Sequence, residues 1–353
     1  MSSSPPSRDL RVSVCIPTNA RPELIIRAIG STLAQSKLPY EILIGDDSED
    51  DATAETVERL QAATVVPMRL FRNRPRLGQG RNVGNLIAHA SGDAILLLHD
   101  DDRIEPRAIE TLARALDDRE VVLAFGKSWV VDAEGKKNRA ETTSLNEHYY
   151  RTPDQRGIVR DTLASAALQQ VPGSGFLVRT EAARTASYEK AAHYYNACDY
   201  VFNVELALRT EGAFYFCDEY VHCYHRTPVS LSRSPTGNSA LMAFAYAHSL
   251  RDELDELDGF RKWMRERSTL AIGQAARLGH LSQAARWFFG PYHRGRILSP
   301  WGMRSAMKIA WAFVRGRQFN SAKPVIPEGA SRAVKEIEAG EYQPSRLESL
   351  GPR

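Results

Sequence analysis

The strongest chemical signal in the sequence is the run His99-Asp100-Asp101-Asp102, which directly follows the apolar segment 94–98. Carboxylate oxygens suit Mg²⁺ or Mn²⁺, and a cation bound by one or two of them keeps positions open for phosphate oxygens. Aspartate is also favoured at the start of a helix, where it accepts hydrogen bonds from free backbone N–H groups. Taken alone, the run fits a metal site and a helix cap equally well.

Two more polar clusters follow apolar segments that are typical of strands. Segment 12–16 leads into Pro17-Thr18-Asn19-Ala20-Arg21, and segment 41–45 leads into Asp46-Asp47-Ser48. Helical spacing of apolar residues separates these strands, at 23–35, 52–60, 79–90 and 106–116. The alternation predicts an α/β fold, a mostly parallel sheet with helices on both faces. Ligands of such sheets bind beyond the carboxyl ends of the strands, so the three polar clusters are expected at one rim.

Beyond residue 116 the pattern is less regular. Segments 121–131, 175–178 and 214–216 are typical of strands, and 199–208 is typical of a helix. After residue 238 the chain is rich in Ala, Leu and Arg, which predicts further helices. A chain of 353 residues exceeds the usual size of one layered domain, so we expect one large catalytic domain plus an appendage.

Composition excludes some classes of protein. The net charge of +3 is too small to indicate a nucleic-acid surface. The four cysteines form no CxxC pair, so we expect buried free thiols in a reducing cytoplasm; a zinc site at Cys217, His222, Cys223 and His225 has no usual spacing. Neither a signal peptide nor a spanning helix is expected from the sequence.

One stretch is unusual in its charge. From residue 267 to residue 327 there is no Asp or Glu, but there are many arginines and several large apolar residues, among them Trp301, Met307 and Trp311. Basic helices with bulky apolar faces bind anionic membrane surfaces. The same pattern also fits a helix that packs on its own domain, or a homodimer contact. All three alternatives remain open. The predicted location is cytoplasmic, and the membrane alternative would add peripheral contact at the inner membrane face.

Taken together and in order, these segments resemble family 2 glycosyltransferases of the GT-A fold, across about residues 11–234. The matching pieces are the strand VSVCIPT at 12–18, the strand EILIGDDS at 41–48, the segment LGQGRNVG at 77–84, and the approach GDAILLLHDDD at 92–102. Each piece is weak alone, but their shared order is specific. The resemblance implies inverting transfer of a sugar from a nucleoside diphosphate, UDP by default, assisted by Mn²⁺ or Mg²⁺.

The resemblance also implies site residues. Asp101 would be the main metal ligand and His225 would complete the metal shell, with His222 as the competing choice. His99 is expected to be hydrogen-bonded rather than metal-bound. The nucleotide-sugar contacts would be Pro17, Thr18, Asn19, Arg21, Asp46, Asp47, Gly78, Arg81, Asp100, Arg226 and Arg233.

Transfer with inversion needs a carboxylate that takes the proton of the acceptor hydroxyl. Asp199, which opens the predicted helix 199–208, matches the family segment that supplies this base; a helix cap is the alternative. Aromatic residues that could stack on an acceptor are Trp129, His193 and Tyr195. The acceptor itself, whether a glycan, a lipid-linked sugar or a small molecule, is left open.

The expected organisation is a disordered N-terminus at 1–10, a nucleotide-sugar-binding half at 11–104, an acceptor-binding half at 105–237, a helical extension at 238–325 and a flexible tail at 326–353. Two other functions remain open. A sugar-1-phosphate nucleotidyltransferase shares a similar fold, although a glycine-rich phosphate loop would be expected directly after its first strand. A non-catalytic protein that binds nucleotide sugars is the second alternative.

Overall fold

The computed structural model describes residues 10–186, 188–226 and 237–318, which form two compact units. The first unit contains described residues up to 192 and from 198 to 226, and the second contains 193–197 and 237–318. The segments predicted as a disordered N-terminus and a flexible tail fall outside the described residues, apart from Leu10.

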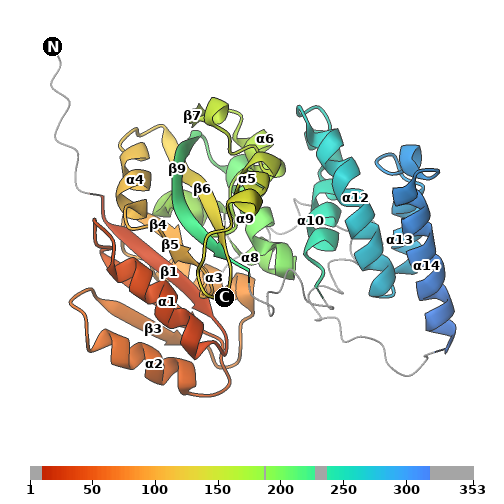
Figure 1. The fold of residues 1–353 in the computed structure, drawn as a ribbon. Coiled ribbons are helices and arrows are strands. Elements are labelled where there is room, and N and C mark those ends of the chain that lie inside the picture. Colours follow the sequence, from red (N-terminus) through yellow and green to blue (C-terminus); the bar gives the residue numbers. More distant parts are fainter. Residues whose placement is uncertain (1–9, 187, 227–236, 319–353) are drawn as a thin grey trace, which may run out of the picture. The chain divides into compact units, whose positions relative to one another are not determined.

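A nine-stranded sheet forms the centre of the first unit, with strand order β3-β2-β1-β4-β8-β6-β9-β5 and β7 paired to β9 (Figure 1). The strands are β1 (Val12–Thr18), β2 (Glu41–Asp46), β3 (Met68–Arg72), β4 (Ala94–Leu97), β5 (Arg103–Ile104), β6 (Val121–Val131), β7 (Gly157–Val159), β8 (Phe176–Arg179) and β9 (Ala213–His225).

The sheet is parallel only in part. Strands β3, β2, β1 and β4 are parallel, as is the pair β6 and β9, whereas β8 is antiparallel to both of its neighbours, β4 and β6. The expected α/β fold is confirmed, but the parallel arrangement predicted for most of the sheet holds over its first half. The reason is that β8 does not follow β4 through a single βαβ crossover, which is the unit that enforces parallel pairing.

Helices cover both faces of this sheet, as predicted. On one face α1 (Pro22–Leu33), α2 (Ala52–Gln61) and α4 (Ala108–Ala115) share a buried apolar cluster with Val12, Val14 and Ile16 of β1. Because side chains alternate along a strand, the opposite face of β1 is left for α3 (Gln79–His89), which contacts β1 and β2. The remaining helices of the unit are α5 (Arg139–His148), α6 (Thr162–Ala167), α7 (Thr180–Ala186), α8 (Tyr188–Ala192) and α9 (Cys198–Arg209).

The second unit is helical, which confirms helices in the region predicted as an extension. It contains α10 (Ser239–Ser249), α11 (Arg251–Leu254), α12 (Phe260–Arg277), α13 (Leu281–Phe288) and α14 (Pro300–Gln318). Helix α12 is central, since it packs against α10, α13 and α14. Among the helices of the described ranges, none is both long enough and apolar enough to cross a bilayer.

The four cysteines, Cys15, Cys198, Cys217 and Cys223, are free and buried, as expected. Burial is the main reason that the pKa of each thiol is raised. Since the thiolate is the reactive form, these cysteines are unreactive. In the described structure the residues grouped closely enough to hold a metal are His99, Asp101 and Asp102, and no cysteine is among them.

Candidate active site

The ends of β1 and β4 bring polar residues together at one rim, as the strand pattern predicted. Thr18 donates a hydrogen bond of 2.8 Å to Asp100. Arg21, at the start of α1, donates to Asp100 at 2.8 Å and to Asp101 at 3.2 Å. Arg21 therefore neutralises part of the charge that two adjacent carboxylates place at this rim.

Three side chains at the rim, His99, Asp101 and Asp102, are grouped closely enough to hold a cation. One possible ligand atom from each lies within 4.8 Å of the others. Burial, together with the negative charges of Asp102 and Asp100, raises the pKa of Asp101 to about 6. A bound cation would relieve this crowding of negative charge, so the electrostatics of the group favour a metal.

Asp102 is held in place by two histidines of β9. The His222 Nε2 atom lies 3.0 Å from Asp102, and the other ring nitrogen lies 3.0 Å from Ser128 Oγ. The backbone N–H of His225 donates to the second oxygen of Asp102 at 3.0 Å. Burial would raise the pKa of Asp102, but His222, together with His99 and the backbone N–H of His225, outweighs burial and lowers this pKa. His222 therefore orients a carboxylate and has both ring nitrogens engaged.

The residues present fit a divalent cation. The ring nitrogen Nε2 of His99 is buried without a hydrogen-bond partner in the described ranges, and it faces the same group as Asp101 and Asp102. One imidazole and two carboxylates are a donor set that suits Mn²⁺, while the carboxylates alone suit Mg²⁺.

This grouping contains two residues that were not proposed as metal ligands from the sequence, and it lacks one that was. Asp101 belongs to it, and so do Asp102 and His99. The His99 ring was expected to be hydrogen-bonded, and its Nε2 atom lies 3.7 Å from an oxygen of Asp199. The ring of His225 is not part of the group; it is buried, and neither nitrogen has a hydrogen-bond partner among the residues that the structure describes. Its assignment as a ligand remains a prediction.

Asp47, at the end of β2, shapes the loop before α3. Its carboxylate accepts hydrogen bonds from Asn73 at 2.8 Å, from the backbone N–H of Leu77 at 3.2 Å and from that of Gly78 at 2.7 Å. Gly78 begins α3 with a φ of 77°, a conformation that glycine adopts without strain. Asp47 and Gly78, which are predicted to contact the nucleotide, thus border one loop, and hydrogen bonds to the Asp47 carboxylate stabilise that loop.

Asp46 and Asn19 lie beside that loop. Asp46 accepts a 2.9 Å hydrogen bond from the backbone N–H of Ser48, and its other oxygen is buried without a partner in the described part of the chain. Asn19 donates to the backbone oxygen of Asp47 at 3.1 Å and accepts from Arg76 at 2.8 Å, with its amide turned to satisfy both. Pro17 is buried within β1.

Asn82 fixes α3 against β2 directly beneath this loop. It donates to the backbone oxygen of Gly45 at 2.7 Å and accepts from Asn73 at 3.0 Å; any side chain on Gly45 would overlap it. Asn82→Ala is expected to lower the free energy of unfolding by about 1–3 kcal/mol, since it leaves buried polar groups unpaired. Urea unfolding measures this, with Asn85→Ala as the control, because Asn85 reaches Asn73 only at 3.5 Å. Equal losses in both variants would contradict the role of Asn82.

Asp199 lies in the first turn of α9, close to the group that could hold a cation. Its carboxylate is 3.7 Å from His99 Nε2, and its side chain is 20% exposed. Burial would lower the pKa of His99, but Asp199, with Asp102 and Asp101 behind it, raises this pKa to about 10. Gly173 leaves the space beside the carboxylate open, since a Cβ there would come within 3.1 Å of it. The predicted base and the predicted metal ligand are thus separated by one histidine.

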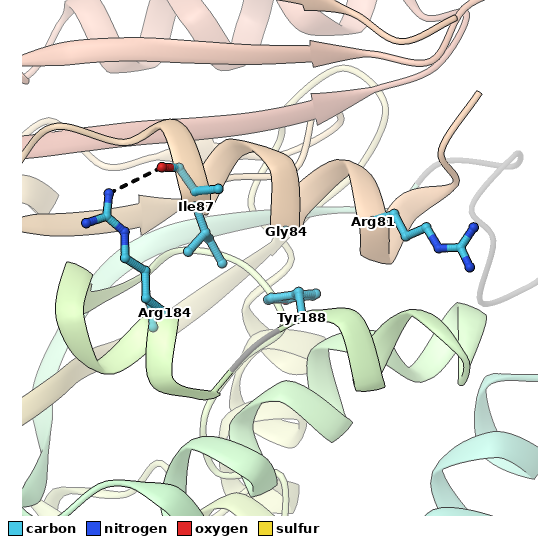
Figure 2. A pocket seen from close by; sticks show the side chains of 7 residues that line it. Arg81, Gly84, Ile87, Arg184 and Tyr188 are labelled. Carbon is cyan, nitrogen blue, oxygen red and sulfur yellow. Dashed lines mark hydrogen bonds between the residues drawn. The ribbon is translucent and has the colours of Figure 1, made fainter. Parts of the chain in front are cut away.

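Tyr188, at the start of α8, holds the other side of Asp199. Its hydroxyl donates to Asp199 at 3.1 Å, and its buried ring stacks on Phe202 at 4.4 Å. The same ring lines a cavity of about 350 Å³ between α3 and α7–α8. Figure 2 shows Tyr188 and Arg184 facing α3, with Arg81 at the far end of the helix, extending away from them. Sequence reasoning missed Tyr188, because only the fold brings it to Asp199.

Tyr188→Phe is expected to lower kcat of the reaction proposed below by about twofold to twelvefold, the range that follows from a net ~0.5–1.5 kcal/mol for one hydrogen bond. KM for the donor should stay unchanged, since the hydroxyl contacts Asp199. Tyr200→Phe is the matched control: its buried hydroxyl donates to the backbone oxygen of Ala167. A similar fall in kcat for both variants would show that lost packing, rather than the orientation of Asp199, is responsible.

Other predicted site residues lie apart from the rim or are engaged elsewhere. Arg81 is exposed on α3. Arg226 forms an ion pair with Glu141 of α5 at 2.5 Å. Arg233 lies outside the described residues. Their roles in phosphate binding remain predictions.

The aromatic residues predicted for the acceptor are not gathered in the first unit. Trp129 stacks on Tyr220 at 3.9 Å. Its neighbour Ser128 points to His222, so Trp129 points to the opposite face of the sheet. His193 belongs to the second unit and is half-buried, and the Tyr195 side chain lies outside the described residues.

Comparison with known proteins gives a family match over part of the chain. Residues 13–171, which contain the three strand ends of the rim, match the model of the family described as Glycosyl transferase family 2. Over this region the chain resembles the family 2 glycosyltransferases. Of the residues proposed above, the matched region includes the metal-binding group and the Asp47 loop, whereas Asp199 and Tyr188 lie beyond it.

Relatives match over the same part of the chain. An uncharacterized protein of Mycobacterium tuberculosis is 39% identical over 115 residues, 32% of this chain and 35% of its own length. A GalNAc(5)-diNAcBac-PP-undecaprenol beta-1,3-glucosyltransferase of Campylobacter jejuni is 31% identical over 102 residues, 29% of this chain and 33% of its own length. The chain thus aligns with about a third of these curated relatives.

A solved structure matches over a greater length. The structure of S. aureus TarS 1–349 in complex with UDP-GlcNAc has a TM-score of 0.52 and 15% identity, and the match covers 94% of this chain and 93% of that one. At this identity the likeness shows the fold alone. The GT-A fold predicted from the motifs is confirmed.

Proposed function

We propose that this glycosyltransferase transfers a sugar from a nucleoside diphosphate to an acceptor hydroxyl with inversion at the anomeric carbon. The observation that carries the proposal is the position of Asp199. Its carboxylate lies 3.7 Å from His99, which shares a group with Asp101 and Asp102 that could hold a cation. A proton acceptor thus stands beside the place where a diphosphate would be bound.

The chemistry needs one displacement. The acceptor oxygen attacks the anomeric carbon while the bond from that carbon to the diphosphate oxygen breaks, and the hydroxyl proton moves to Asp199. A divalent cation held by Asp101, Asp102 and His99 would supply charge neutralisation for the departing diphosphate. Tyr188 orients the Asp199 carboxylate, and Arg21 keeps Asp100 and Asp101 in place.

The nucleotide would bind over the ends of β1 and β2. The residues proposed to contact it are Thr18, Arg21, Asp100 and the Asp47–Gly78 loop, which the structure brings to one rim. We propose a UDP-sugar as donor, because the structure of TarS 1–349 contains UDP-GlcNAc and shares this fold. The acceptor is an alcohol of a glycan, a lipid-linked sugar or a small molecule.

A thermal-shift screen tests the donor and the cation together. UDP with Mn²⁺ is expected to stabilise the protein by about 3 kcal/mol at one hundred times its dissociation constant, and GDP and dTDP by less. EDTA should remove most of this effect. A shift that is equal for all three nucleotides would contradict the UDP assignment, and a shift that EDTA leaves unchanged would contradict the metal.

A further inference from the structure

Helix α14 of the second unit presents large apolar side chains to solvent. Met303, Met307, Trp311 and Val314 are 55%, 65%, 62% and 49% exposed. Their spacing of three and four residues places them along one side of the helix. We call these four residues the outer face of α14. Exposed apolar side chains that form a continuous stripe mark an interaction surface, whereas isolated ones do not.

The outer face is not the face by which α14 packs on its own unit. Gly302 and Ser305 are buried, and Ile309 and Ala312 are half-buried, so these mostly small residues form the side that meets α12 and α13. The sequence left open that the large apolar residues pack α14 on its own domain, but mostly small residues make that contact. The bulky residues of α14 have another role.

Charge decides what kind of partner the outer face fits. Arg304 and Arg315 are exposed and lie along one edge of it, and the Arg315 guanidinium lies 5.5 Å from the centre of the Trp311 ring. Between residues 267 and 327 the sequence contains no carboxylate side chain that could neutralise them. A symmetric contact between two copies would bring these arginines close to one another, which is unfavourable. An anionic surface fits both the charge and the apolar stripe.

We propose that the outer face of α14 docks on an anionic lipid bilayer, with Met307 and Trp311 at the level of the head groups and with Arg304 and Arg315 against lipid phosphates. Tryptophan favours this interfacial region, and basic amphipathic helices lie in its plane. The surface goes beyond the proposed sugar transfer and does not depend on it.

Vesicle flotation of the full chain tests the surface without measuring transfer. The probes are vesicles of equal parts phosphatidylglycerol and phosphatidylcholine, compared with phosphatidylcholine alone. The outer-face variant is Met307→Gln with Trp311→Gln, and the charge variant is Arg304→Gln with Arg315→Gln. The matched control is Leu38→Gln with Val65→Gln, which changes two residues of the first unit that are 50% and 93% exposed. Circular dichroism checks that each variant is folded.

The wild type and the control are expected to float with the anionic vesicles. The outer-face variant is expected to bind these vesicles at least about tenfold more weakly than the wild type. The charge variant should lose about as much and should no longer prefer anionic vesicles. Failure of the wild type to bind, or equal binding by the outer-face variant, overturns the proposal. So does a wild-type dimer in sedimentation that the outer-face variant abolishes without any vesicle binding, because the partner is then a second copy.

Discussion

Asp101→Asn is expected to lower kcat/KM for sugar transfer by about a thousandfold or more, since loss of a metal ligand removes several kcal/mol of charge stabilisation from the departing diphosphate. Asp101 belongs to the group that could hold a cation, and burial together with the charges of Asp102 and Asp100 raises its pKa to about 6. The variant should also lose the Mn²⁺-dependent part of the thermal shift with UDP.

Initial rates of transfer, measured across a series of Mn²⁺ concentrations, give the first readout. Asp117→Asn, which changes an exposed aspartate after α4, serves as the control and should match the wild type. If Asp101→Asn kept near wild-type rates with metal chelated, the metal-assisted reaction would be wrong. If it lost activity but kept the same Mn²⁺ dependence, the cation would lie elsewhere.

Asp199→Asn is the second large effect. Transfer should fall by about a hundredfold to ten-thousandfold, the usual contribution of a positioned general base. The amide keeps the shape and can still accept a hydrogen bond from Tyr188, so the fold and the UDP-dependent thermal shift should be retained. This separates loss of the base from loss of the donor site.

The measurement is single-turnover transfer at saturating donor, with Glu211→Gln, an exposed residue after α9, as the control. Nearly full activity of Asp199→Asn would refute its role as base. Equal losses of transfer and of UDP binding would assign Asp199 to the donor site instead.

The buried strands and the rim could be predicted because each signal lies within a few neighbouring residues. All seven residues of β1 and all six of β2 are buried, so their apolar runs are continuous in the sequence. The strand β6 was predicted with its observed bounds, 121–131, for the same reason. The residues that follow these strands then reach the rim by topology alone.

Elements with mixed composition were missed. Strand β9 runs over thirteen residues, but only 214–216 read as a strand, since exposed and charged positions such as Glu219 interrupt the apolar pattern. Strand β3 was not predicted, because its sequence MRLFR mixes arginines with apolar residues. Periodicity cannot recover such strands, because neighbouring strands rather than their own composition stabilise them.

Partnerships between distant residues were also beyond the sequence. Tyr188 meets Asp199 through the packing of α8 on α9, and His222 meets Asp102 through the pairing of β5 with β9. Each side chain looks ordinary in its local context. No role was predicted for Asp102, although it is adjacent to Asp101 and the run of acidic residues was a signal that could have identified it.

Burial of all the native thiols has a practical benefit for experiments. Cys15, Cys198, Cys217 and Cys223 are buried, and their raised pKa values favour the protonated thiol. Maleimide reagents should therefore react with them only slowly under native conditions. A single cysteine introduced at an exposed position such as Val65 would then be the preferred target for a fluorophore. Spectroscopic reporters can therefore be attached without first removing any of the natural cysteines.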